Sequence, residues 1–238
     1  MTWHSDYDRL LRQRIFEPWA NVLLDFVGLG RGQVVVDVAT GPGTVARVAA
    51  ERVGPTGRVT GVDLSGPMLA VARAKPILAG MAPIEYVESP AAPLAVPDDA
   101  FDVAFCQHGL HQFPERLAAL SEMRRALKPG GRIAVATWDA AGPLPLSVDS
   151  YAGQVGEVIE RKPELEFGRH PKELEEALVG AGFREVHAEQ KALSIAWEGG
   201  VEQILEYLSC SRRRDLEALV DGGVLRYTTR ANLARGVK

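Results

Sequence analysis

Residues 34–49, VVVDVATGPGTVARVA, contain the glycine spacing best suited to bind a ligand. Gly41, Gly43 and Ala46 fit the pattern G-x-G-x-x-A, between a run of β-branched residues and a helical pattern. Glycine lets a ligand approach the backbone amides closely, and the free N–H groups of the following helix point at the same place. The junction therefore predicts a site for a dinucleotide or for another adenosine-bearing cofactor.

Asp63 lies 20 residues after Gly43, at the end of the next apolar run. A carboxylate there can accept hydrogen bonds from both hydroxyls of a ribose, and both bonds would be charge-assisted. The structural alternative is a tight turn before a packed helix, with Asp63 acting only as a cap. The spacing favours the adenosine site.

Asp37 lies four residues before Gly41 and separates the two kinds of cofactor. The pyrophosphate of a dinucleotide binds at a free helix N-terminus, and a nearby acid repels it. The same acid suits an ammonium group, or it can hold the loop around it. This favours a cofactor with an amino-acid tail and no phosphate, as in S-adenosylmethionine. A nicotinamide-dependent dehydrogenase is the less favoured alternative.

The elements that must position these residues alternate between strand-like and helix-like segments. We expect buried strands of a parallel sheet at 34–38, 59–62, 84–87, 101–106 and 132–137. Residues 184–195 and the tail from Leu225 should complete the sheet. This order predicts an α/β fold: a Rossmann-like, doubly wound, mostly parallel seven-stranded sheet with helices on both faces.

The segments between the expected strands have the apolar spacing of amphipathic helices. Ser65 can cap a helix with Pro67 in its first turn, and a short helix covers 173–183. The expected apolar faces are Val45, Val48, Ala49 and Val53; Leu117, Leu120, Met123 and Leu127; and Val201, Ile204, Leu205 and Leu208.

The chain is expected to form one domain over residues 1–238, with two additions to the sheet. Residues 1–30 form an N-terminal helical cap, interrupted near Pro18. Residues 139–170 form an inserted segment that includes Tyr151.

Composition limits the partners of this chain. Its 238 residues carry a net charge of −4, which gives no long-range attraction for nucleic acid or for an anionic membrane. No apolar run approaches the roughly 20 residues needed to span a bilayer, and the charged N-terminus shows no signal peptide. We therefore expect a cytoplasmic protein without a membrane span. The oligomeric state stays open, a homodimer included.

The motifs and their order resemble class I S-adenosylmethionine-dependent methyltransferases, in the small-molecule branch of the ubiquinone/menaquinone C-methyltransferases. VVVDVATGPG resembles the glycine motif VLDVGCGTG of that family, and GVDLSGPMLAVARAK resembles its acidic ribose loop and helix. PDDAFDVAFCQHGLHQFPE, LKPGGRIAVATWD and EEALVGAGFREV resemble later motifs of the family. The resemblance covers about residues 30–190. It implies methyl transfer from S-adenosylmethionine to a small-molecule acceptor by in-line displacement, with S-adenosylhomocysteine as product.

The resemblance also implies the residues that hold the cofactor. They are Asp37, Ala39, Thr40, Gly41, Gly43, Asp63, Leu64, Met68, Pro90, Ala91, Gln107 and His108. Thr40 stands where the family usually has Cys or Gly, and Pro42 separates the glycines. Pro90 replaces an Asp that accepts the adenine amine in relatives. Adenine recognition would then rest on the backbone near Ala91 and on apolar contacts of Leu64 and Met68.

His108 and His111, in the loop QHGLHQF, are the candidate catalytic bases, because this loop borders the methyl group in the family fold. Methyl transfer from a sulfonium depends mainly on alignment, and a base is needed only where the acceptor must lose a proton. The alternative is that both histidines position the loop.

No spacing of His, Cys and Asp suggests a metal site. A cofactor-binding protein without catalysis remains the second hypothesis, and the methylated atom, O, N or C, stays open.

Overall fold

The structure is a computed structural model that describes residues 11–139, 167–198, 202, 217 and 219–238. Most of the segment expected as an insertion, with Tyr151, lies outside the described residues. So do the first ten residues and almost all of the helical pattern that begins at Val201.

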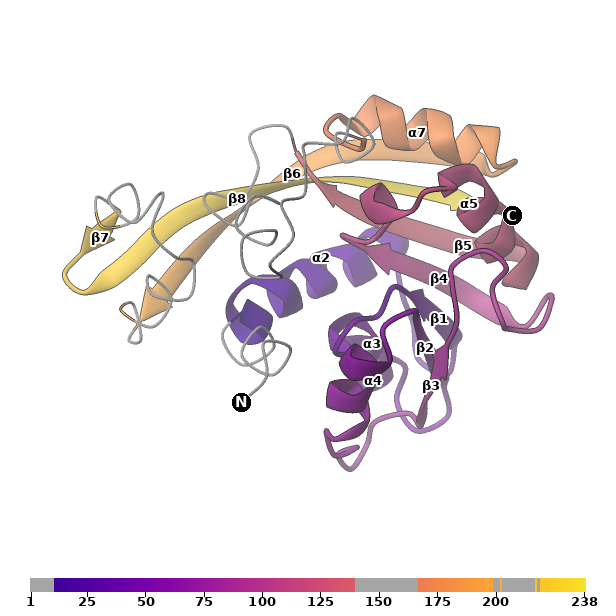
Figure 1. Cartoon of the computed structure of the whole chain (residues 1–238), viewed down its shortest axis with the longest axis horizontal. Coiled ribbons are helices and arrows are strands. Elements are labelled where there is room, and N and C mark those ends of the chain that lie inside the picture. Colours follow the sequence, from indigo (N-terminus) through magenta and orange to yellow (C-terminus); the bar gives the residue numbers. More distant parts are fainter. Residues whose placement is uncertain (1–10, 140–166, 199–201, 203–216, 218) are drawn as a thin grey trace.

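A single sheet organises the fold (Figure 1), with the strand order β3-β2-β1-β4-β5-β8-β6. Its strands are β1 (Val34–Val38), β2 (Arg58–Asp63), β3 (Ile84–Glu88), β4 (Phe101–Gln107), β5 (Leu127–Trp138), β6 (Arg184–Glu198) and β8 (Val224–Val237). A two-residue strand, β7 (Val220–Asp221), pairs only with β8. The first five strands are parallel, and β8 is antiparallel to both of its neighbours in the sheet order. The predicted mostly parallel, Rossmann-like sheet is confirmed. The expectation of a buried strand at 84–87 is wrong, because β3 is the last strand at one edge of the sheet and none of its residues is buried.

Helices cover both faces of the sheet, as predicted. Helices α2 (Glu17–Val27) and α3 (Thr44–Val53) share one buried apolar cluster with β1 and β4. Helices α5 (Arg116–Ala126) and α7 (Pro171–Gly180) pack into a second cluster on the other face. Helix α4 (Gly66–Arg73) packs on β2 and β3, and its N-cap residue is Ser65, as the sequence predicts.

The predicted apolar face of α5 is wrong at both ends. Leu120 and Met123 are buried, but Leu117 is 55% exposed because the sheet lies on the other side of the helix there. Leu127 is extended and begins β5, where it pairs with Phe101. The strand register then moves from Leu127 to Arg132, so the KPGG residues between them have no strand-pairing partner on β4, although Lys128 Nζ contacts Asp102 Oδ1 of β4 at 2.7 Å. The helical spacing of apolar residues in the sequence therefore extends beyond the residues that form α5.

The N-terminal cap runs through Pro18 without a break. A π-helical turn, Arg12–Phe16, passes directly into α2. Pro18 follows directly on the change from π-helix to α-helix and lies in the first turn of α2, so the interruption expected near it is a change of helix type rather than a break. Ile15, Trp19 and Leu23 are buried, and Trp19 Nε1 donates a 2.9 Å hydrogen bond to Thr229 Oγ1 on β8. The cap is thus anchored to the sheet. In the described ranges, no helix is long and apolar enough to cross a membrane.

Candidate functional site

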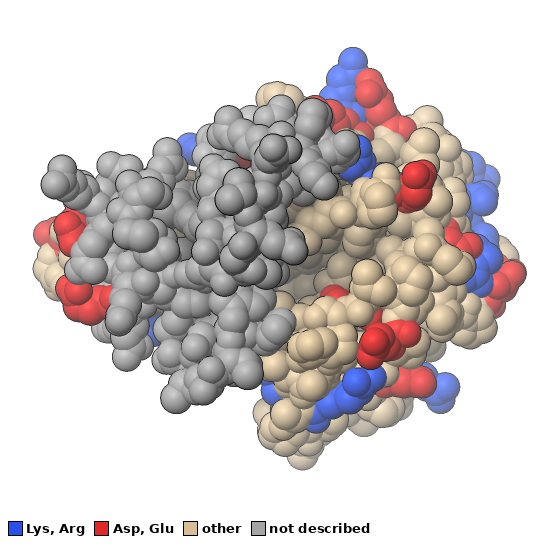
Figure 2. Space-filling model, in the orientation of Figure 1, with Lys and Arg blue, Asp and Glu red and all other residues tan. Residues whose placement is uncertain are grey.

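A cavity of about 830 Å³ opens at the carboxyl ends of the parallel strands. It lies between β1 and β4, where the strand order reverses, and ligands of open α/β sheets bind at such switch points. Residues that directly follow β1, β2, β3 and β4 line it, together with Phe16 from the N-terminal cap. Figure 2 shows the hollow in the middle of this face, with described walls that are mostly uncharged.

The structure brings most of the predicted cofactor residues to this cavity. Those lining it are Ala39, Thr40, Gly41, Asp63, Leu64, Met68, Pro90, Ala91, Gln107 and His108. Asp37 and Gly43 do not line it. Sequence reasoning did not assign Gln112, Phe113 and Glu115, which also line the wall after β4. The sequence could have indicated these residues only by their position, because they continue the loop QHGLHQFPE that contains the two histidines.

Asp37 holds the glycine loop from below the cavity. Its carboxylate is 1% exposed, and Oδ2 accepts hydrogen bonds from Thr40 Oγ1 at 2.5 Å and from the Ala46 amide at 3.1 Å. Burial raises the pKa of Asp37 to about 7, against the two hydrogen bonds, which lower it. Of the two sequence-based roles, positioning the loop is the one that these contacts support.

The raised pKa of Asp37 has a consequence for stability. The unfolded carboxyl titrates near 3.8 and the folded one near 7, so the folded state binds more protons in between. Stability contributed by Asp37 is therefore present below about pH 4 and lost as the pH rises through 7. We expect the free energy of unfolding of the wild type to fall relative to Asp37→Asn between these values. Urea unfolding of both proteins at several pH values measures this difference, and parallel curves would contradict it.

Asp63 lies at the end of β2, beside the glycine loop. Its Oδ2 accepts a 2.7 Å hydrogen bond from the Gly41 amide, and its Oδ1 accepts a 2.8 Å bond from the Ser65 amide. Each carboxylate oxygen can still accept a further bond. Asp63 is therefore able to hold two hydroxyl groups while it ties two loops of the cavity together.

The two glycines of the motif face different surroundings. Both have positive φ, 54° at Gly41 and 80° at Gly43. A Cβ atom on Gly41 would meet nothing within 4 Å, whereas one on Gly43 would lie 2.4 Å from Tyr86 Oη. Gly41 therefore leaves room in the cavity, and Gly43 leaves room for the Tyr86 side chain from β3. The structure thus gives Gly43 a packing role beside Tyr86, and the expectation that it also borders the cofactor stays a prediction.

Two other cavity residues have a left-handed backbone although they carry side chains. Ala39 has φ 60° and His108 has φ 55°, directly after β1 and β4. A left-handed residue with a Cβ atom costs about 1–2 kcal/mol and is kept mainly where the surrounding structure demands it. The strain lies on both sides of the switch point, which supports a binding role for this edge.

The wall after β3 has no side-chain acceptor for an adenine amine at Pro90. The Ser89 hydroxyl is 5% exposed and is used within the loop, where it donates to the Pro90 carbonyl at 2.9 Å and accepts from the Ala95 amide at 3.0 Å. Leu64, which also lines the cavity, is 71% exposed. The prediction that a base here would meet apolar or backbone groups is compatible with these residues and stays a prediction.

The two candidate bases differ in their surroundings. The imidazole of His108 stacks on Trp138 with ring centroids 3.7 Å apart, and neither ring nitrogen has a hydrogen-bond partner. Burial lowers the pKa of His108 well below 6.5, so it is neutral. His111 is also buried but does not line the cavity. Its pKa falls to about 4 because of burial and of Arg169 and Arg116 nearby.

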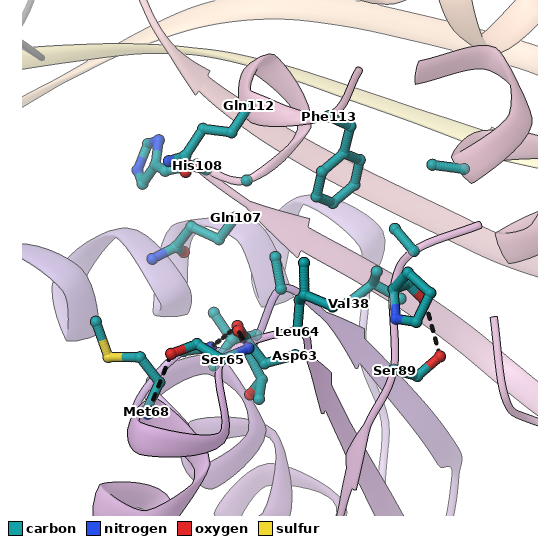
Figure 3. Close-up of a pocket in the computed structure, with 18 of the residues that line it drawn as sticks. Val38, Asp63, Leu64, Ser65, Met68, Ser89, Gln107, His108, Gln112 and Phe113 are labelled. Atoms are coloured by element: carbon teal, nitrogen blue, oxygen red, sulfur yellow. Dashed lines mark hydrogen bonds between the residues drawn. The ribbon is translucent and has the colours of Figure 1, made fainter. Parts of the chain in front are cut away.

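Gln107 and His108 lie on one side of the cavity, and Asp63, Ser65 and Met68 lie on the other (Figure 3). Among the described residues that line it, Asp63 and Glu115 are acidic and none is Lys or Arg. Such a wall suits a cation and offers nothing to neutralise a pyrophosphate. Gln107, which lines the cavity, adds a buried acceptor without a partner, Oε1. These residues fit S-adenosylmethionine better than a dinucleotide. No cluster of His, Cys, Asp and Glu in the described ranges could hold a metal ion.

Comparisons with known proteins agree with this geometry. The model of the ubiE/COQ5 methyltransferase family matches residues 4–155. A chloroplastic 2-phytyl-1,4-beta-naphthoquinone methyltransferase of Arabidopsis thaliana is 30% identical over 181 residues, 69% of each chain. A demethylmenaquinone methyltransferase of Staphylococcus aureus is 36% identical over 149 residues, 61% of each chain, so the match spans about three fifths of that relative.

Solved structures show the same fold. A phosphoethanolamine N-methyltransferase 2 of Haemonchus contortus, in complex with S-adenosyl-L-methionine, has a TM-score of 0.63 and 21% identity, covering 99% of this chain and 56% of that one. An S-adenosylmethionine-dependent methyltransferase of Aquifex aeolicus has a TM-score of 0.58 and 20% identity, covering 98% and 99%.

Proposed function

This chain belongs to the ubiE/COQ5 family of S-adenosylmethionine-dependent methyltransferases, and we propose that it methylates a small, planar aromatic acceptor of the quinol type. The names of the two relatives, which act on a naphthoquinone and on a demethylmenaquinone, support this acceptor class. The observation that carries the proposal is the neutral, unpartnered imidazole of His108 on an aromatic wall beside the cofactor cavity.

The wall around His108 is aromatic and uncharged. Trp19 meets the His108 ring edge-on at 6.4 Å, and Phe16 lies at the same distance. Trp138 also contacts Trp19 in an edge-to-face arrangement, with centroids 5.9 Å apart. Of these aromatic residues Phe16 lines the cavity, whereas Trp19 and Trp138 do not. A planar, apolar acceptor can therefore pack against Phe16 and His108, and the imidazole supplies one hydrogen-bonding group for its hydroxyl. The absence of Lys and Arg from the described wall disfavours a phosphorylated acceptor.

The chain's part in the reaction is mainly alignment. When bound, the cofactor supplies a methyl group that its positive sulfur already activates. Asp63 and the glycine loop orient the ribose and the tail, and the wall after β4 excludes water and faces the acceptor. Orientation of this kind contributes roughly 7–11 kcal/mol. His108, which is neutral, would take the acceptor proton while the methyl carbon gains its bond to carbon or oxygen and loses its bond to sulfur.

The proposal is tested by incubating the protein with S-adenosylmethionine and a reduced demethylnaphthoquinone, and by measuring the mass of the product. A gain of one methyl group, with phosphoethanolamine left unmodified, is the expected result. Methylation of phosphoethanolamine but not of quinols would contradict the acceptor class.

His108→Phe separates catalysis from packing. Phenylalanine keeps the stack on Trp138 but cannot accept a proton, so kcat should fall by roughly 10²–10⁴-fold. The dissociation constant of S-adenosylhomocysteine should change little, because that ligand needs no base. His111→Phe is the matched control and should keep kcat within about threefold, since His111 does not line the cavity. An equal loss in both variants would show that the loop, rather than a base, was disturbed.

A further inference from the structure

We propose that Gln107 is a positioning residue that couples cofactor binding to the N-terminal cap. This rests on the proposed function only in that the cavity binds S-adenosylmethionine. The carboxamide lies between two parts of the molecule that are far apart in sequence. Its nitrogen holds the cap, and its oxygen is free to accept a hydrogen bond from the cofactor.

The orientation of the amide follows from its partner. Gln107 Nε2 donates a 3.1 Å hydrogen bond to the carbonyl oxygen of Phe16, 91 residues earlier in the chain. A carbonyl oxygen can only accept, so the nitrogen must face Phe16. The amide oxygen is therefore turned away from the cap.

The amide oxygen has no hydrogen-bond partner within the protein. Gln107 Oε1 is buried, and Gln107 lines the cavity opposite Asp63, Ser65 and Met68 (Figure 3). A buried acceptor without a partner is unfavourable until a donor reaches it. S-adenosylmethionine carries donors that can satisfy the oxygen, among them its ammonium group and its ribose hydroxyls.

The hydrogen bond from Gln107 ends on the cap at the point where the π-helical turn becomes an α-helix. Phe16 is the last residue of the π-helical turn, and α2 begins at Glu17. Single π-helical turns are frequent at functional sites. Phe16 itself lines the cavity, and one turn later Trp19 contacts His108. Moving the Phe16 carbonyl therefore moves the aromatic wall proposed for the acceptor.

Because one carboxamide would make both hydrogen bonds, cofactor binding at Oε1 and the position of the cap at Nε2 depend on each other. A cofactor donor on Oε1 holds the amide in place and so favours the cap position in which Phe16 receives Nε2. By linkage, a well-placed cap raises cofactor affinity by the same factor. The cofactor should therefore order the acceptor wall before the acceptor binds.

Hydrogen exchange of residues 11–27, with and without S-adenosylhomocysteine, tests the coupling. In the wild type the ligand should slow exchange in this segment at least about tenfold. Gln107→Glu keeps an acceptor but loses the donor to Phe16. It should bind the ligand up to about tenfold more weakly, in line with the lost coupling, lose the added protection and raise the acceptor KM more than it lowers kcat. Gln107→Leu should lose both affinity and protection.

Asn21→Ala is the matched control on the same helix. The Asn21 amide also donates to a backbone carbonyl, that of Glu17, but it is exposed and does not line the cavity. This variant should keep the ligand-induced protection. Full protection in Gln107→Glu, or its loss in Asn21→Ala, would overturn the proposal. If S-adenosylhomocysteine did not bind the wild type, the proposed function would fail instead, so the two failures are distinguishable.

Discussion

Asp63→Ala is expected to weaken the binding of S-adenosylhomocysteine at least tenfold. If Asp63 accepts both ribose hydroxyls as predicted, the substitution removes two charge-assisted hydrogen bonds, each worth about 1.5–3 kcal/mol. It also leaves the amides of Gly41 and Ser65 without the carboxylate that now holds them at 2.7 and 2.8 Å. Because the same side chain binds the ligand and joins two loops, the loss should exceed that for the ribose contacts alone.

Calorimetric titration of S-adenosylhomocysteine measures this effect, and thermal unfolding shows whether the fold survives. Glu115→Ala is the control, since Glu115 is the other acidic residue on the described wall. It should weaken binding by less than about threefold if hydrogen bonds rather than overall charge matter. An unchanged dissociation constant in Asp63→Ala would show that the ribose binds elsewhere, and equal losses in both variants would indicate a charge effect.

Gly43→Ala is expected to destabilise the fold, whereas Gly41→Ala should mainly impair cofactor binding. At Gly43 the added Cβ lies 2.4 Å from Tyr86 Oη and 3.2 Å from Ala72 Cβ, on a backbone with φ 80°. Backbone strain and overpacking together should lower the free energy of unfolding by about 2–5 kcal/mol.

Gly41→Ala places the same atom in open space. Its left-handed backbone costs about 1–2 kcal/mol, but the methyl group projects where the ligand approaches. Affinity for S-adenosylhomocysteine should fall about tenfold or more, because an intruding methyl group costs roughly 1–3 kcal/mol. Urea unfolding and calorimetry on both variants separate the two effects. Normal stability of Gly43→Ala, or normal affinity of Gly41→Ala, would reverse the roles assigned to them.

Local chemistry was enough to predict the strands and the centre of the cavity. Short apolar runs bounded by Gly, Pro or Asp predicted β1 to β4, and the spacing of Gly41 and Asp63 predicted the cofactor edge, whereas most of the other cavity residues were implied by the family resemblance. Parallel strands bring their carboxyl ends to one edge, which is why Gly41, Asp63, Ala91 and His108 meet although they are far apart in sequence.

Which way each side chain faces was decided only when the elements packed together. The sequence treats Gly41 and Gly43 alike, but Tyr86 of β3 occupies the space beside one of them. Leu117 and Leu127 continue a helical repeat, yet one is exposed and the other begins β5, because the sheet covers only one side of α5. The bond from Gln107 to Phe16 joins residues 91 positions apart, and no local pattern encodes it. Periodicity and turn chemistry act over a few residues, whereas burial and partner choice depend on atoms supplied by distant segments.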